Sequence, residues 1–330
     1  MAKKKEDYLC LSAMLRAREP RFLNNDRAQR MLDAPTFEDA AKLLTDCGYE
    51  DMSTLSAGEV EAALAQRRAA IFREVETLSP EKELVDVFKM KYDYHNAKAV
   101  IKAEAMGLDA GRMLSDSGRI SPEKLVSAYN EERGADLPPV LAEAMWEAKA
   151  ILARTANPQL ADFVLDRAYF QEFKAAAKAV DSAFLEGYAQ VMIDSTNLKS
   201  AVRTLRMGKN ADFMASVLIP SGSVDADRMA AAGDKDGISA LFANSALEKA
   251  AALGAEAVEG GSMTAFELAC DNAVTAYLTR AKLISYGSEA VVAYLAAVEG
   301  EITAVRMILT GKLAGIQPGV IRERLRDLYA

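Results

Sequence analysis

One stretch of the chain occurs twice at a constant spacing. Residues 87–107 read VFKMKYDYHNAKAVIKAEAMG, and residues 188–208 read YAQVMIDSTNLKSAVRTLRMG. Without a gap, each matched residue lies 101 positions from its counterpart: Asp93 and Asp194, Asn96 and Asn197, Lys98 and Lys199, Met106 and Met207, Gly107 and Gly208. An internal duplication of this kind indicates that one structural unit is built more than once.

Both copies have the spacing of an amphipathic helix that ends at a glycine. Asp93, Asn96 and Val100 follow one another at intervals of three and four residues, and the second copy repeats the stripe. A terminal glycine suits the left-handed residue that closes many helices. Because an Asp and an Asn three residues apart share one face, we expect a polar clasp that fixes each helix in its own bundle. A ligand site is the second interpretation of the same pair.

A third, more divergent copy occupies residues 291–311, VVAYLAAVEGEITAVRMILTG. It lacks the Asp and the Asn, and Glu299, Glu301 and Arg306 supply its polar groups. A loop and a short helix are predicted after each terminal glycine. We therefore expect three helical repeats over residues 1–120, 121–222 and 223–330, with the N-terminal helices able to pack on the last repeat.

The fold class predicted from the whole chain is all-α. Ser56 and Glu59 form a capping-box pattern before a long apolar-periodic stretch, and Ser79-Pro80, Ser121-Pro122 and Thr264 to Glu267 mark further helix starts. No segment shows sustained alternation with β-branched enrichment, which a strand would require.

Charge and cysteine content exclude several classes of function. A formal net charge of −8 over 330 residues, with no basic stripe beyond the MAKKK start, argues against nucleic-acid binding and against adhesion to anionic lipid. Three widely spaced cysteines indicate no disulfide framework, and we expect all three to be small core residues. No apolar run is long enough to span a membrane.

The residues of common catalytic sites are missing. His95 is the only histidine, so a zinc site with two imidazole ligands is not indicated. A Ser-His-Asp triad would have to use His95 itself. Gly208-Lys209 and Gly311-Lys312 lack the rest of a P-loop and follow helices instead of preceding them. An enzyme based on carboxylates alone stays open as a third interpretation, and no metal or cofactor is expected.

The repeated segments carry a resemblance to a known family. KYDYHNAKAVIKAEAMG with GRISPEKL, IDSTNLKSAVRTLRMG, and VEGEITAVRMILTGKLAGIQPGVIRERL resemble the three copies in the C subunits of the archaeal and bacterial A/V-type ATPases. The N-terminal LSAMLRAREPRFL and APTFEDAAKLLTDCGY resemble the opening helices of that family. The likeness runs essentially from end to end, and the d subunit of the vacuolar ATPase is a more distant relative.

This resemblance implies a funnel of three helical bundles around a pseudo-threefold axis in the central rotor. Such a protein has no catalytic residues and no cofactor. It sits on the cytoplasmic face of the membrane, on the proteolipid ring, and receives the central shaft in its cavity without entering the membrane. It passes torque between the ATP-handling head and the ring for ion transport or ATP synthesis.

Two questions about the polar residues and the assembly stay open at this point. The candidates either hold the bundles together or line the cavity that faces the shaft. They are Asp93, Asn96, Lys98, Asp194, Asn197, Lys199, Arg203, Arg206, Glu301 and Arg306. The alternative function is a free-standing helical-repeat adaptor, for which an open solenoid is expected instead of a closed funnel.

Overall fold

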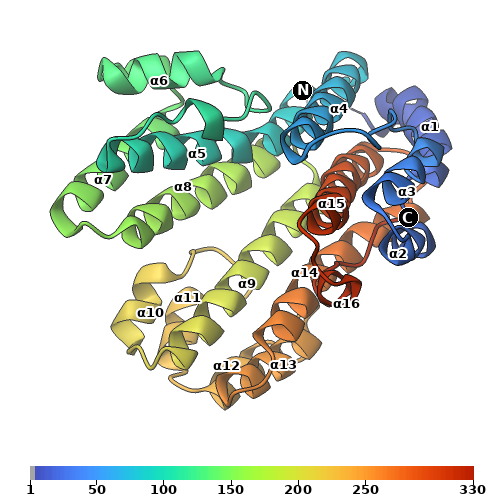
Figure 1. Cartoon of the computed structure of the whole chain (residues 1–330). Helices are drawn as coiled ribbons and strands as arrows, with labels where there is room; N and C mark the ends of the chain where they lie inside the picture. Colours follow the sequence, from blue (N-terminus) through green and yellow to red (C-terminus); the bar gives the residue numbers. More distant parts are fainter. Residues whose placement is uncertain (1–3) are drawn as a thin grey trace. The chain divides into compact units, whose positions relative to one another are not determined.

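The computed structural model describes residues 4–330, and within these residues all regular secondary structure is helical (Figure 1). The predicted all-α class is therefore confirmed. Besides sixteen α-helices, the described residues contain short 3₁₀ segments: η1 Lys5–Tyr8, η2 Glu19–Arg21, η3 Thr45–Cys47, η4 Gly111–Met113, η5 Gly134–Asp136 and η6 Arg280–Leu283.

The chain divides into two compact units. One comprises Met1–Pro80 with Gln190–Ala330, and the other comprises Glu81–Ala189. The chain passes from one unit to the other at Pro80–Glu81 and again at Ala189–Gln190, within the long helix α9 (Ala183–Arg206). The division into three repeats at residues 120 and 222 stays a prediction.

The first bundle lies in the unit Glu81–Ala189. It consists of α5 (Glu83–Met106), α6 (Pro122–Asn130), α7 (Pro139–Thr155) and α8 (Pro158–Ala179). α5, which carries the first copy of the repeated sequence, packs against α7 and α8. Its buried positions include Val100 and Ala103, on the stripe that the sequence predicts.

The second bundle is built on α9. It adds α10 (Ala211–Val217), α11 (Ala226–Ala231), α12 (Lys235–Leu241), α13 (Glu248–Val258) and α14 (Met263–Thr279). Leu198 and Val202 of α9 share one hydrophobic cluster with Phe242 and Phe266, which come from the end of α12 and from α14. The second copy of the repeat therefore forms one wall of its own core.

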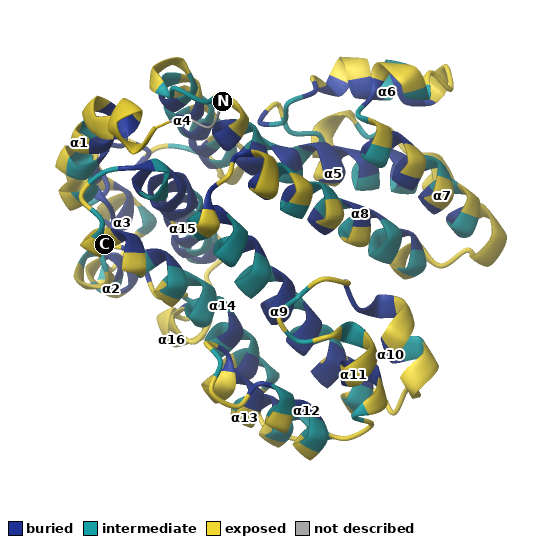
Figure 2. Ribbon diagram, turned by 180° about the vertical axis from the view of Figure 1, so that it is seen from behind, coloured by how far each residue is buried: buried dark blue, intermediate teal, exposed yellow. Residues whose placement is uncertain are grey.

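The third bundle joins the two ends of the chain. Its long helix α15 (Ser288–Leu313) packs against α1 (Leu9–Arg18), α2 (Asn25–Asp33), α3 (Phe37–Lys42), α4 (Ala57–Leu78) and α16 (Pro318–Arg322). The first half of α15 is buried on nearly every side, as Figure 2 shows. The N-terminal helices thus supply the packing partners of the last copy.

Helix boundaries agree with the sequence where a cap is local. Ser56 and Glu59 form the predicted capping box, and Ser121 caps α6. Gly107 and Gly208 both adopt a left-handed conformation with φ of +64°. At these sites a residue type favoured at helix ends lies at the end itself, so the local sequence suffices.

Other predicted boundaries are wrong. α5 begins at Glu83, because Ser79 closes α4 instead of opening the next helix. The N-cap of α14 is Ser262, not Thr264. α15 continues through Gly311, where a Cβ would meet Ile321 Cδ1 at 2.7 Å, and the left-handed residue is Gly315. Gly311 therefore serves the close approach of α16.

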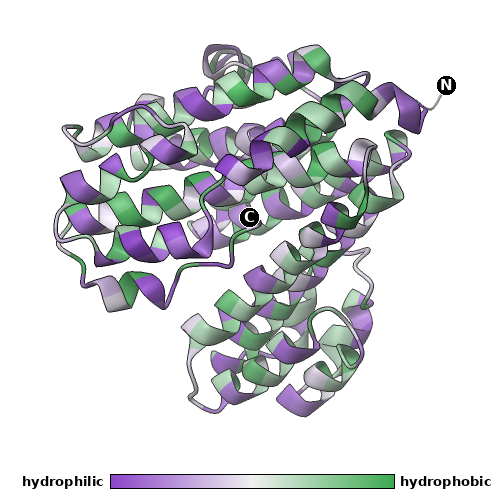
Figure 3. Ribbon diagram, turned by 90° about the vertical axis from the view of Figure 1, so that its right-hand side faces the viewer, coloured by the Kyte–Doolittle hydropathy of each residue, from purple (hydrophilic) through white to green (hydrophobic). Residues whose placement is uncertain are grey.

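The cysteines and the hydropathy pattern complete the description. Cys47 and Cys270 are buried as expected, and burial raises the pKa of Cys270 to about 12. Cys10 is exposed, so the prediction that it is a core residue was wrong. Figure 3 shows hydrophobic and hydrophilic residues mixed along the helices. Among the described residues, no helix combines the length and the apolar character that a membrane crossing requires.

Candidate functional site

Asp93 and Asn96 of the first copy fasten the loop that follows α5. Both side chains are fully buried. Asp93 Oδ1 accepts hydrogen bonds from the backbone N–H groups of Arg119 and Ile120 at 2.9 and 3.2 Å. Asn96 exchanges two hydrogen bonds with the backbone of Ser115, at 2.9 and 2.8 Å. We call this arrangement the first clasp.

The second copy repeats the arrangement with the same geometry. Asp194 Oδ1 accepts from the N–H groups of Ser223 at 2.7 Å and Val224 at 3.4 Å, and Ser223 Oγ also donates to this carboxylate. Asn197 exchanges two hydrogen bonds of 2.7 Å with the backbone of Ile219. This second clasp shows that the duplicated Asp and Asn have duplicated partners.

A glycine lies beside the aspartate in each clasp. A Cβ added to Gly118 would overlap Asp93 Oδ1, and a Cβ added to Gly222 would overlap Asp194 Oδ1. Although α5 and α9 correspond at a spacing of 101, these glycines are 104 residues apart. The second loop thus contains three additional residues before the clasp and recovers the same contact.

Electrostatics distinguish the first clasp from the second. Arg119 donates from Nε to Asp93 Oδ2 at 2.6 Å and from Nη1 to Glu172 Oε1 at 2.7 Å. Burial raises the pKa of Asp93, while the Arg119 guanidinium and the backbone donors oppose this rise. In the second clasp the Ser223 hydroxyl donates to Asp194 Oδ2. The first clasp therefore contains an ion pair between a fully buried carboxylate and a partly buried guanidinium.

Two ion pairs, one helical turn apart, join α5 to α8. Lys98 Nζ contacts Asp166 Oδ1 at 2.6 Å, and Lys102 Nζ contacts Asp162 Oδ2 at 2.7 Å. We call each such pair a rung. The two acids stand nine and five positions after Asn157, the N-cap of α8.

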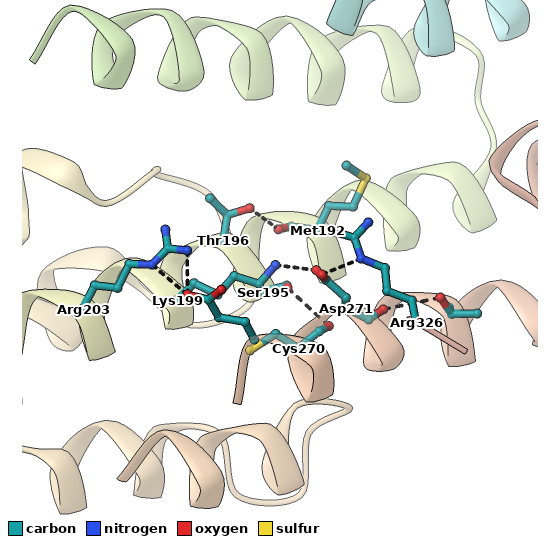
Figure 4. Close-up of polar contacts among 10 residues, drawn as sticks. Met192, Ser195, Thr196, Lys199, Arg203, Cys270, Asp271 and Arg326 are labelled. Atoms are coloured by element: carbon teal, nitrogen blue, oxygen red, sulfur yellow. Dashed lines mark hydrogen bonds and ion pairs between the residues drawn. The ribbon is translucent and has the colours of Figure 1, made fainter. Parts of the chain in front are cut away.

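The second bundle has the same two rungs between α9 and α14. Lys199 pairs with Asp271, and Arg203 binds Glu267 Oε1 from Nε and Nη2 at 3.0 and 2.7 Å (Figure 4). These acids again stand nine and five positions after the N-cap, here Ser262. Arg326 also reaches Asp271 Oδ2 at 2.7 Å and so fastens the C-terminal segment to α14.

The third copy retains one rung, and the acidic partner of this rung comes from the N-terminal part of the chain. Arg306 stands five positions before Gly311, as Lys102 does before Gly107. Its Nε contacts both carboxylate oxygens of Glu61 at 2.7 and 2.8 Å. Glu61 lies on α4 and stands five positions after the N-cap Ser56. α4 is therefore the counterpart of α8 and α14.

A different carboxylate replaces the clasp in the third copy. Glu301 is buried, and it accepts from Leu23 N at 2.6 Å and from the Tyr49 hydroxyl at 2.7 Å. Arg67 lies 3.6 Å from the same side chain. Burial raises the pKa of Glu301, and the backbone donor and Arg67 oppose this rise. Glu301 thus fastens α15 to residues in the N-terminal part of the chain.

Arg206 completes the set of predicted residues. Its Nη1 donates to the backbone oxygens of Ala257 and Gly261 at 3.2 and 3.1 Å, at the corner between α13 and α14. The structure therefore gives every predicted residue a contact with another part of its own bundle. Sequence analysis did not identify the acidic partners, although their repeated spacing from three N-caps was present as a signal.

Between residues 4 and 330 no three His, Cys, Asp or Glu side chains are grouped so that they could hold a metal ion. His95 is exposed, and its Nε2 lies 3.0 Å from the backbone oxygen of Met113. What the arrangement does is to fasten long helices to loops and to neighbouring helices.

The chain is similar to the C subunits of several ATPases and ATP synthases. A family model described as ATP synthase (C/AC39) subunit matches residues 11–324. The C subunit of the V-type sodium ATPase of Enterococcus hirae is 23% identical over 98% of this chain and 99% of its own length. The C subunit of the A-type ATP synthase of Methanocaldococcus jannaschii is 25% identical over 97% and 86%. The C subunit of the V-type ATP synthase of Thermus thermophilus is 25% identical over 63% and 66%.

Proposed function

The chain belongs to the ATP synthase (C/AC39) subunit family, and from this premise we propose that it is a non-catalytic coupling subunit of the central rotor. In this role it joins the central shaft of the ATP-handling head to the proteolipid ring. It works at the cytoplasmic face of the membrane as a peripheral component. The observation that carries the proposal is the family match over residues 11–324, which includes all three copies.

The bundle geometry supports a role in transmitting force. A coupling protein must resist shear, so each long helix needs fixed attachments to its neighbours. The two clasps and the rungs provide these attachments, and charge-assisted hydrogen bonds of this kind are short and directional. Three similar bundles also suit partners with rotational symmetry, which favours the funnel arrangement expected for this family.

Among the predicted cations, Arg203 is the best candidate for contact with the shaft. Its side chain is 54% exposed while it holds Glu267, whereas that of Lys199 is 21% exposed. Arg203 can therefore meet a partner without leaving its bundle. Asp93, Asn96, Asp194 and Asn197 are assigned to the bundle interior, because they are buried.

Binding to both partners tests the proposed function. The purified full chain is mixed with the shaft proteins and, separately, with the detergent-solubilised proteolipid ring, and stable complexes are measured by co-purification. Both complexes are expected. A well-folded chain that bound neither would favour the free-standing adaptor.

A charge exchange tests the contact at Arg203 without removing the rung. The variant Arg203→Glu with Glu267→Arg keeps an ion pair between α9 and α14 but reverses the exposed charge. Weaker shaft binding is expected, with unchanged thermal stability. The matched control exchanges Lys98→Asp with Asp166→Lys in the first bundle, and equal effects of the two exchanges would refute a specific contact at Arg203.

A further inference from the structure

Arg206 in the second bundle has a fixed place relative to a helix corner. It stands two positions before Gly208 and donates to the carbonyl oxygens of Ala257 and Gly261. These two residues stand five and one positions before Ser262, the N-cap of α14. The guanidinium thereby occupies the corner where α13 ends and α14 begins.

The first bundle has no guanidinium of its own at the corresponding place. The residue two positions before Gly107 is Ala105, and the residues five and one positions before the N-cap Asn157 are Leu152 and Ala156. Ala105, Leu152 and Ala156 all line a groove of about 760 Å³. The groove therefore lies where, in the second bundle, the guanidinium of Arg206 is bound.

The groove offers acceptors for a cation. Within residues 4–330, Asp162 Oδ1 is buried without a hydrogen-bond partner, while Oδ2 of the same carboxylate accepts from Lys102. A buried acceptor left without a donor is costly, and such an atom commonly marks a missing partner. The carbonyl groups at the C-terminal end of α7 add negative potential at the same corner.

The walls of the groove favour arginine over lysine. Ile101, Met106 and Pro158 provide apolar surface that the methylene stem of an arginine can cover. A planar guanidinium also loses less hydration than an ammonium, and its several donors can reach a carboxylate and carbonyl oxygens together. Lys102 and Lys149, which also line the groove, are held by Asp162 and Glu104, at 2.7 and 3.2 Å.

We propose that this groove binds an arginine side chain presented by a partner protein, with the guanidinium in the place that Arg206 occupies in the second bundle. The proposal goes beyond the rotor function and does not depend on it, because it concerns recognition by one bundle. The carboxylate of Asp162 and the backbone at Leu152 and Ala156 are the recognition groups.

The test is a titration of the full chain with the peptide acetyl-Leu-Arg-Leu-amide, followed by Trp146 fluorescence. Trp146 is the only tryptophan and lies on α7, with the Lys149 ammonium 5.9 Å from its ring centroid. A dissociation constant on the order of 0.1–1 mM is expected for so small a ligand. The same peptide with citrulline in place of arginine is expected to bind at least tenfold more weakly. Equal binding of the two peptides, or no binding of either, overturns the proposal.

Two variants locate the site. Ala105→Arg supplies the guanidinium from within the chain, at an exposed helical position, and is expected to abolish peptide binding. Asp162→Asn is expected to weaken it about tenfold, the scale of one charge-assisted hydrogen bond. Asp166→Asn, on the same helix but outside the groove lining, is the matched control and is expected to leave binding unchanged. Undiminished binding by the Ala105→Arg protein would refute the site.

Discussion

The first and third bundles fasten the same kind of long helix in different ways. α5 is held by Asp93 and Asn96, whose partners follow within the next 30 residues of the chain. α15 is held by Glu301, whose partners Leu23 and Tyr49 lie more than 250 residues away in sequence. Yet both helices keep a cation five positions before the corresponding glycine.

This difference in contacts shows which part of the repeat depends on the order of the segments in the chain. A clasp joins a helix to the loop that follows it, whereas Glu301 of α15 binds Leu23 and Tyr49 from the N-terminal part of the chain. A rung joins two helices whatever their order in the chain, so it persists when α4 replaces α8 as partner. The third bundle is thus the same unit closed across the chain ends.

Removal of the clasp carboxylates is expected to have the largest effect. Asp93→Ala leaves the Arg119 guanidinium with one of its two acids and leaves two backbone N–H groups without acceptors. We expect a loss of about 3–5 kcal/mol in the free energy of unfolding. Asp194→Ala leaves the backbone N–H groups of Ser223 and Val224 without this acceptor and is expected to cost about 2–3 kcal/mol.

Local measurements are needed because the chain comprises two compact units, and a single two-state transition is not the rule for such proteins. Hydrogen exchange of α5 and α9 checks each clasp, and Trp146 fluorescence during urea unfolding checks the first bundle. The exposed loop residue Asp116 provides the control, and its change to alanine should alter stability by less than about 0.5 kcal/mol. A larger loss for Asp194→Ala than for Asp93→Ala would contradict the ion-pair assignment.

The glycines beside the clasps are expected to show a smaller loss. Alanine at Gly118 or Gly222 would overlap the neighbouring carboxylate, so each change should destabilise by about 1–3 kcal/mol. Gly58 is the matched control, because it lies in α4 with nothing within 4 Å of an added Cβ. There alanine should stabilise by about 0.5–1 kcal/mol. Thermal unfolding of the three variants makes the comparison, and tolerance of alanine at both clasp glycines would refute the close approach.

The pH dependence of stability should differ between the unchanged protein and a variant in which Glu301 is replaced by glutamine. Burial raises the pKa of Glu301 above its ordinary value, so the native protein retains a proton where the unfolded chain has lost it. Its contribution is therefore fully present below the ordinary pKa of glutamate and is lost as the pH rises through the folded pKa. Glu301→Gln should remove this fall, which amounts to about 1.4 kcal/mol for each unit of pKa difference. Urea unfolding between pH 4 and pH 8 measures it, and identical pH profiles would contradict the assignment.

The sequence predicted the elements that repeat locally. The duplicated Asp and Asn, the glycines that close α5 and α9, and the capping box of α4 could all be identified because each depends on residues close in sequence. The all-α class followed from the same local signals. The family resemblance was also visible in the repeated segments and is confirmed by the family match.

The contacts between distant segments could not be predicted in the same way. Glu301 was recognised as a polar residue of α15, but nothing near it in sequence identifies Leu23 N as its donor. Ser79-Pro80 suggested a helix start, and packing of α4 extended the preceding helix to Leu78 instead. Tertiary context decides such positions, since several local conformations have similar free energies.

The smallest expected effect concerns the second rung, which the third bundle has lost. The positions of Lys98 and Asp166 in the first bundle correspond to Ile302 and Ala65 in the third. Because the Lys98 and Asp166 side chains are 25% and 44% exposed, their ion pair should contribute only about 0.2–1 kcal/mol. Lys98→Ile with Asp166→Ala should therefore change stability by less than about 1 kcal/mol. A double-mutant cycle on these two positions measures the coupling. A coupling well above 1 kcal/mol would mean that the rung is indispensable to the first bundle, and the third bundle would then need a substitute that compensates for its loss.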